Sequence, residues 1–270
     1  MATPPAASAS RSKSPAKPAF ARAFACAAAC ACALSAISFS PTAVAAPPHS
    51  DFNGDGFDDL AIAIPNQDVD GAVNAGAVQV LYSRANGVRF ASAQLFTQNS
   101  PGIPDSAANS DRFGSALAWG DFNADGFDDL AIGTPLDDVG GPLNRPDTGS
   151  VTIIYGSAIG LDPNGDIDAE FFRQGAGGVR DNAETNDQFG WTLAVGDFDG
   201  DGFDDLAVGV IGEDLPLSTD AGAVHVFYGG EGGLTTSCSY PARGMGAWTV
   251  RIGRRSMAAP CRRLRGDKPG

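Results

Sequence analysis

Short apolar stretches with alternating side chains recur along the chain and predict β-strands. In residues 149–156 (GSVTIIYG), Val151, Ile153 and Tyr155 lie on one side of an extended chain, whereas Thr152 and Ile154 lie on the other. Glycine and proline interrupt the sequence at roughly 8- to 20-residue intervals, which disfavours long helices. The pattern therefore predicts an all-β fold built from short strands.

The predicted strands fall into repeated units of similar order. A unit holds a strand that starts with Phe-Gly, an acidic loop, a strand of small and branched residues, a polar loop, a third strand and a weaker fourth strand. In chain order, the predicted strands cover residues 60–65, 76–83, 88–96, 113–121, 130–135, 149–156, 168–175, 189–197, 206–211 and 222–229. Four short strands per unit is typical of a β-propeller blade.

The acidic loop recurs almost letter for letter and sets the repeat period. It reads DFNGDGFDDLAI at 51–62, DFNADGFDDLAI at 121–132 and DFDGDGFDDLAV at 197–208, with spacings of 70 and 76 residues. Periods of this size indicate one supersecondary unit per repeat. A β-sandwich would explain the strands but not the period. Gly133 and Gly149 would allow close packing where blades crowd together.

The spacing of oxygen-bearing residues in each loop predicts a calcium site. Counted from the first Asp, side-chain oxygens occur at positions 1, 3, 5 and 9, a main-chain carbonyl at position 7 and glycine at position 6. Calcium takes six to eight oxygen ligands, whereas magnesium demands a tighter octahedron. About three ions are expected, with these ligands: Asp51, Asn53, Asp55, Phe57, Asp59; Asp121, Asn123, Asp125, Phe127, Asp129; Asp197, Asp199, Asp201, Phe203 and Asp205.

The loop differs from an EF-hand, because position 12 is apolar and already lies within a predicted strand. The loop would therefore close at position 9, between two strands. The remaining acidic residues, at position 8, are expected to point away from the ion, toward solvent or groups around the site; they are Asp58, Asp128 and Asp204. Carboxylates crowded into one turn repel each other without metal, so calcium binding should couple to folding.

Charge divides the chain into three parts. Residues 1–50 hold four basic residues and no acidic one, residues 51–233 carry a net charge of −25, and residues 234–270 carry +7. A domain this acidic favours cations over nucleic acid as partners. Residues 51–233 also contain no cysteine, so disulfides do not stabilise this part.

The N-terminus predicts an export signal over residues 1–45. A basic segment precedes the apolar run 23–39, and cleavage is expected before Ala46. A transmembrane anchor is the alternative, although the run is short and rich in alanine. The signal predicts a secreted, periplasmic or cell-surface protein with no membrane span after cleavage.

The order Phe-Gly, strand, Gly-Asp, acidic loop and Leu-Ala-Ile/Val resembles the FG-GAP repeats of integrin α-subunit β-propellers and their bacterial relatives. The resemblance covers about residues 51–233. It implies four-stranded blades of a seven-bladed propeller, with calcium bound at positions 1, 3, 5, 7 and 9 of the loops. The propeller domain is thus assigned to residues 46–233.

Two departures from this pattern indicate an incomplete propeller. The first repeat lacks its Phe-Gly strand, and about three blades are present, whereas closed propellers contain at least about four. Open blade edges would favour self-association.

Residues 234–270 carry no repeat signature, and no strand is predicted there. Two interpretations stay open for this basic tail: a genuine appendage that binds the acidic domain or another partner, or a frameshifted, disordered segment that cuts a longer propeller short.

The acidic domain offers no evident catalytic group. His225 is its only histidine and lies in a predicted strand, where a packed or surface role is the simpler interpretation. The sequence thus favours a non-catalytic, exported, calcium-binding scaffold for an unidentified protein or glycan ligand, with adhesion as one role. The alternative is a non-catalytic propeller module of a larger hydrolase, such as the phospholipase that shares this repeat.

Overall fold

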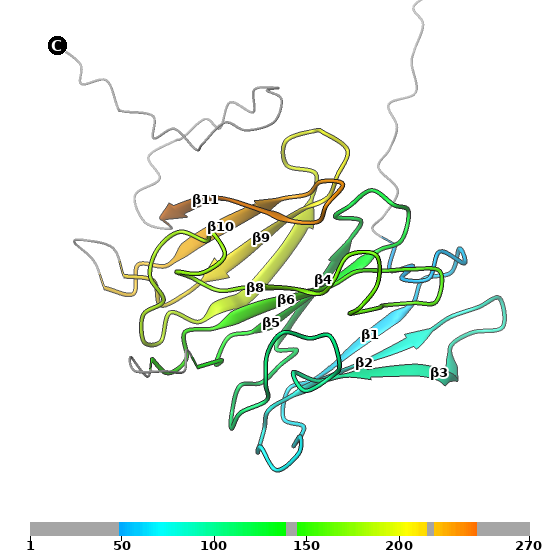
Figure 1. Cartoon of the computed structure of the whole chain (residues 1–270), viewed down its shortest axis with the longest axis horizontal. Helices are drawn as coiled ribbons and strands as arrows, with labels where there is room; N and C mark the ends of the chain where they lie inside the picture. Colours follow the sequence, from blue (N-terminus) through cyan, green and yellow to red (C-terminus); the bar gives the residue numbers. More distant parts are fainter. Residues whose placement is uncertain (1–48, 139–144, 215–218, 242–270) are drawn as a thin grey trace, which may run out of the picture. The chain divides into compact units, whose positions relative to one another are not determined.

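A computed structural model describes residues 49–138, 145–214 and 219–241, and side chains up to residue 235. These residues form strands, turns and loops (Figure 1). No helix suited to crossing a membrane occurs within these ranges. The all-β prediction is confirmed.

The strands form three antiparallel sheets, each a meander of neighbouring strands, which we call blades 1, 2 and 3. Blade 1 holds β1 (Leu60–Ile64), β2 (Ala77–Tyr82) and β3 (Arg89–Phe96). Blade 2 holds β4 (Ala116–Gly120), β5 (Asp129–Thr134), β6 (Ser150–Ile154) and β7 (Glu170–Phe172). Blade 3 holds β8 (Phe189–Gly196), β9 (Asp205–Val210), β10 (Ala223–Tyr228) and β11 (Thr235–Pro241).

The sheets do not close on themselves and form a partial propeller, as the sequence predicts. Blade 1 has three strands, and β1 pairs with β2 alone. In blades 2 and 3 the corresponding strands, β5 and β9, each have a second neighbour, β4 or β8. Within residues 49–138, blade 1 has no strand equivalent to β4 or β8, so β1 lies at the edge of its sheet.

Strand β11 corrects the sequence-based prediction that the propeller repeats end at Gly233. No strand is predicted after Gly233, yet β11 pairs antiparallel with β10 and completes blade 3. Its threonines suit a strand, but its short polar sequence carries little alternation, so pairing with β10 decides its structure. The third blade therefore extends to Pro241, and residues 242–270 lie outside the described residues.

The hydrophobic core consists of two clusters, one in each joint between neighbouring blades. Ile154 packs with Val78, Val80 and Tyr82 in the joint of blades 1 and 2. The opposite side of β6, carrying Val151, Ile153 and Tyr155, packs with Leu206 and Val208 in the joint of blades 2 and 3. The alternation predicted for β6 thus places its two sides in two different joints.

Glycines permit the close approach of successive blades. A Cβ atom at Gly133 would overlap the main-chain oxygen of Gly190, and one at Gly149 would overlap the backbone of Phe189. Gly149 also forms a parallel bridge to Phe189. The close packing predicted for these glycines is confirmed.

Candidate metal centre

The three acidic loops share one local geometry. In each loop, side-chain oxygens from positions 1 and 3 accept the same backbone N–H, which belongs to position 5. The oxygen-to-nitrogen distances are 3.1 and 3.0 Å in the first loop, 3.1 and 3.1 Å in the second, and 3.1 and 3.2 Å in the third. The chain therefore gathers the first two predicted ligands of each loop around one point.

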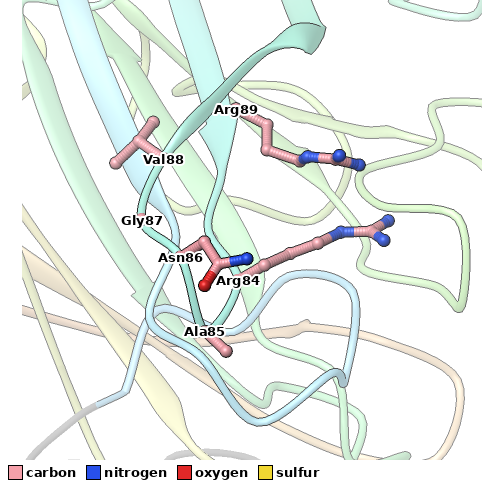
Figure 2. Close-up of a pocket in the computed structure, with 6 residues that line it drawn as sticks. All are labelled: Arg84, Ala85, Asn86, Gly87, Val88 and Arg89. Carbon is pink, nitrogen blue, oxygen red and sulfur yellow. The ribbon is translucent and has the colours of Figure 1, made fainter.

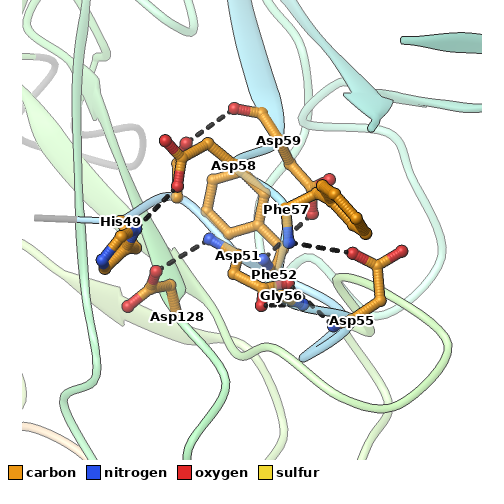
Figure 3. Close-up of polar contacts among 10 residues, drawn as sticks. His49, Asp51, Phe52, Asp55, Gly56, Phe57, Asp58, Asp59 and Asp128 are labelled. Atoms are coloured by element: carbon orange, nitrogen blue, oxygen red, sulfur yellow. Dashed lines mark hydrogen bonds and ion pairs between the residues drawn. The ribbon is translucent and has the colours of Figure 1, made fainter. Parts of the chain in front are cut away.

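Further backbone donors fix the turn, as Figure 3 shows for the first loop. The second oxygen of Asp51 accepts the N–H of Gly56 at 2.7 Å, and Asp55 accepts the N–H of Phe57 at 3.2 Å. Both contacts recur in the other two loops. The glycine at position 6 has a positive φ each time (87°, 91° and 97°), a conformation that other residues adopt at a cost. The predicted carbonyl ligands at position 7 belong to the same turns.

The carboxylate at position 9 connects its loop to the neighbouring hairpin. Asp129 is fully buried and accepts the N–H of Phe122 with one oxygen and that of Gly156 with the other, both at 2.9 Å. Asp59 and Asp205 repeat this arrangement. Burial raises the pKa of Asp129 to about 8, and those of Asp59 and Asp205 to about 6, although the backbone donors oppose the shift.

The third loop provides the tightest group of carboxylates. One oxygen from each of Asp197, Asp199 and Asp205 lies within 4.8 Å of the others, the only such group of three among the described residues. Calcium binds oxygens at 2.3–2.6 Å, so two ligands of one ion lie at most about 5 Å apart. These three residues fit that limit. The first two loops carry an amide, Asn53 or Asn123, where the third has Asp199.

Two of the three carboxylates at position 8 contact the preceding blade. Asp128 accepts the N–H of Asp51 at 2.8 Å (Figure 3). Its own N–H donates to the Asp51 carbonyl at 3.1 Å. Asp204 and Asp121 form the same reciprocal pair, at 3.1 Å in both directions. Each pair joins the position-1 residue of one acidic loop to the acidic loop of the next blade.

Asp58, the remaining position-8 residue, has no earlier blade to contact within the described residues. Its largely exposed carboxylate instead pairs with His49 at 2.8 Å. This contact raises the pKa of the equally exposed His49.

A second repeated feature, which the sequence interpretation missed, is a buried polar cluster beside each of two blades. Gln98, Asp111 and Asp137 belong to the first cluster; Gln174, Asp187 and Glu213 occupy the corresponding places 76 residues later. Gln98 donates to the half-buried Asp105 at 2.8 Å, and Gln174 donates to Glu213. The common spacing of 76 residues is the signal that could have revealed both clusters.

His225 is a packed residue, in line with the simpler interpretation of the sequence. It is 3% exposed, and its ring meets that of Phe189 edge-on at 5.5 Å. Burial lowers its pKa. The imidazole therefore belongs to the interior of blade 3.

The three meanders, one of three strands and two of four, are joined through apolar faces and carry an acidic loop at equivalent places. This arrangement defines a partial β-propeller. The family model described as FG-GAP repeat matches residues 43–81, 113–154 and 189–227. The chain is an FG-GAP repeat protein that resembles integrin α subunits. The prediction from the loop and strand motifs is thus confirmed.

The similar curated proteins fall into two groups. Phosphatidylinositol-glycan-specific phospholipase D from Mus musculus is 37% identical over 163 residues, covering 59% of this chain and 17% of that protein. Integrin alpha-PS2 from Drosophila melanogaster is 36% identical over 173 residues (61% and 11%), and integrin alpha-5 from Xenopus laevis is 32% identical over 173 residues (62% and 14%). The chain therefore matches a small part of each relative, and that part contains the FG-GAP repeats.

Proposed function

We propose that this chain is a calcium-binding β-propeller module of an exported scaffold, which binds a protein or glycan ligand and performs no catalysis itself. The observation that carries the proposal is the threefold recurrence of one loop geometry, in which oxygens from positions 1 and 3 converge on a single N–H. Chance acidic turns would not repeat these contacts. The predicted N-terminal signal supports export, and similarity to integrin α subunits supports a role in adhesion.

Calcium would have a structural role in this proposal. Position 1, 3 and 5 side chains would supply oxygens, with the position 7 carbonyl and the position 9 carboxylate completing the set. The ion would replace repulsion among these carboxylates by attraction, which holds the loop and the strand after it in place. The ligand would bind elsewhere, and the polar segments 66–75 and 136–148 are candidates because propeller specificity resides in variable loops. Residues 139–144 of the second segment lie outside the described residues.

Calorimetric titration of the metal-free chain with calcium tests the proposal. About three sites are expected. Asp125→Ala and Asp201→Ala should each remove one site, and the double variant two. Asp68→Ala, an acidic residue outside the loops, is the control and should retain all sites. Absence of calcium binding to a folded chain would refute the metal assignment.

The second candidate function is a non-catalytic propeller module of a larger hydrolase. It is favoured by the similarity to phosphatidylinositol-glycan-specific phospholipase D, which is confined to the repeats. Sequencing the gene through the segment encoding residues 234–270 and beyond distinguishes the two. A catalytic domain in the same reading frame supports the hydrolase; further repeats without one support the scaffold.

A further inference from the structure

Blades 1 and 3 are the first and last blades within the described residues, and we call them the end blades. Each exposes an apolar face that is buried where another described blade lies beside it. Leu130 and Ile132 of blade 2 face blade 1 and are completely buried. Their counterparts in blade 1, Leu60 and Ile62, are 46% and 37% exposed. We call this surface of blade 1, including Val88, the front end face.

On blade 3, the surface that faces away from blade 2 is also exposed, although the equivalent surfaces of blades 1 and 2 are buried. Phe52 of blade 1 and Phe122 of blade 2 are fully buried, whereas the equivalent Phe198 of blade 3 is 37% exposed. Val78 and Val151 are fully buried, and the equivalent Val224 is again 37% exposed. We call this surface, with Phe198 and Val224, the back end face.

The hairpin between β2 and β3 is equivalent in sequence to two hairpins that contact a tyrosine of the preceding blade. In both internal joints a Gly-Leu pair in the next blade sits against a tyrosine hydroxyl: the Leu161 N–H donates to Tyr82 at 2.8 Å and the Leu234 N–H to Tyr155 at 3.0 Å. A Cβ atom at Gly160 or Gly233 would overlap that hydroxyl.

Gly87 and Val88 occupy the equivalent place in blade 1, but no atom lies within 4 Å of a Cβ built on Gly87. Val88 is 41% exposed, whereas Leu161 and Leu234 are buried. Figure 2 shows this hairpin, with Val88 directed to one side and the side chains of Arg84 and Arg89 to the other. The position matching Tyr82 and Tyr155 on the back end face is Tyr228.

The acidic loops complete the match between the two ends. Each internal joint pairs a position-8 carboxylate with the backbone of a position-1 residue in the preceding blade. At the front end, Asp58 presents such a carboxylate, which is 65% exposed. At the back end, Asp197 is the corresponding position-1 residue. The front end face thus carries the apolar surface, the hairpin and the position-8 carboxylate of the repeated joint, and the back end face carries their partners. The Phe-Gly strand, which bridges to Gly76 and Gly149 in the internal joints, has no counterpart among the described residues of blade 1.

We propose that two copies of the chain assemble head to tail, with the front end face of each against the back end face of the other. The occupant of each face is a second copy because this chain already builds the joint twice, and the two end faces carry the same repeat positions for most of it. Contact between unlike surfaces forms a closed ring when the rotation is completed. Two copies supply six blades, within the range of four to eight that closed propellers contain.

Sedimentation velocity of the full chain across a wide concentration range tests this assembly. A discrete species of twice the chain mass is expected. Ile62→Asp on the front end face and Val224→Asp on the back end face should each abolish the dimer, because every joint in a homodimer then contains one buried, unpaired charge. Ile159→Asp is the matched control: Ile159 is 78% exposed and lies on neither end face, so this variant should remain dimeric.

Mixing the two variants distinguishes head-to-tail contact from other modes. Ile62→Asp retains a normal back end face and Val224→Asp a normal front end face, so the mixture should regain a dimer through one intact joint. Front-to-front pairing predicts instead that Val224→Asp alone stays dimeric.

Hydrogen exchange of the unmodified chain provides a test that needs no variant. Amides of β1 and the 84–89 hairpin, and those of β10, should gain protection as concentration rises. A chain that stays monomeric at every concentration, a ladder of longer polymers, or variants that fold and still dimerise would overturn the proposal.

Discussion

At the scale of single residues, two glycines make room for a tyrosine of the neighbouring blade, because glycine has no side chain that would overlap the tyrosine hydroxyl. Gly160 and Gly233 have φ values of 106° and 95°, and each lies against a tyrosine hydroxyl of the preceding blade. Tyr155 also donates to Glu170 at 2.5 Å. Glycine meets both requirements here, since it tolerates positive φ and leaves room for the ring.

Substituting alanine for Gly160 should therefore destabilise the chain more than the same change at Gly87. Both glycines have positive φ, so both variants incur backbone strain of about 1–2 kcal/mol. Gly160→Ala also displaces the Tyr82 hydroxyl, and loss of its hydrogen bond costs roughly 1 kcal/mol more. Urea unfolding at low protein concentration measures the difference. An equal decrease in the free energy of unfolding in the two variants would show that the contact with Tyr82 does not contribute to stability.

In the acidic loops, contacts within one loop can be predicted from the sequence, whereas contacts between blades cannot. Their repeated spacing predicts the convergence of positions 1 and 3, because those contacts are made within nine residues of chain. The bond from Asp128 to Asp51 spans 77 residues and depends on how blades pack, so local spacing does not encode it. The buried, doubly bonded state of Asp129 likewise requires the hairpin beyond it.

At the scale of elements, the loop after β9 carries a carboxyl group with a shifted proton affinity. Glu213 is 6% exposed, and burial raises its pKa from an ordinary value of 4.5 to about 7. Gln174 donates to it and opposes the shift, whereas Asp187, Asp181 and Glu184 add repulsion. The folded chain therefore holds this proton more tightly than the unfolded chain does.

The stability contributed by Glu213 is fully present below pH 4.5 and is lost as pH rises through about 7. One pKa unit corresponds to about 1.4 kcal/mol, so the expected contribution is on the order of a few kcal/mol. Unfolding free energies measured in chelator at pH 5 and pH 8 should show this decline.

Glu213→Gln preserves the size of the side chain and removes its titration. This variant should lose less stability than the parent between the two pH values. Asp220→Asn, a change at an exposed acidic residue, serves as the control and should keep the parent slope. An unchanged slope in Glu213→Gln would contradict the assignment.

Strands with clear alternation were predictable from the sequence, and strands defined by pairing alone were not. The sequence places β2, β6 and β10 well because valine, isoleucine and aromatic residues alternate there. Prediction fails at β11, whose polar residues are held by the ladder to β10. It also overextends the strand at 168–175, since β7 covers Glu170–Phe172 and Gln174 already serves the polar cluster.

At the scale of the whole molecule, the proposed calcium sites would make stability depend on metal. If the loops bind calcium as proposed, each site adds about 2.7 kcal/mol at a hundredfold excess of calcium over its Kd. Calcium should therefore raise the thermal unfolding midpoint, and a chelator should lower it and expose the loops to proteolysis.

Scanning calorimetry with calcium, with chelator and with magnesium measures this dependence. Magnesium should stabilise less, because the loops do not impose its octahedral geometry. Equal midpoints in calcium and chelator would contradict a structural role for the ion. The Asp125→Ala variant should show a smaller calcium-induced shift than the parent.

The reciprocal pairs Asp51–Asp128 and Asp121–Asp204 make the two internal joints chemically alike. Recombination between the stretches of gene that encode the nearly identical acidic loops would therefore insert or delete one whole blade without creating a new kind of contact. Lineages could change blade number in single genetic steps while each remaining blade keeps neighbours of the same type. The number of blades could therefore evolve independently of the sequence of any single blade.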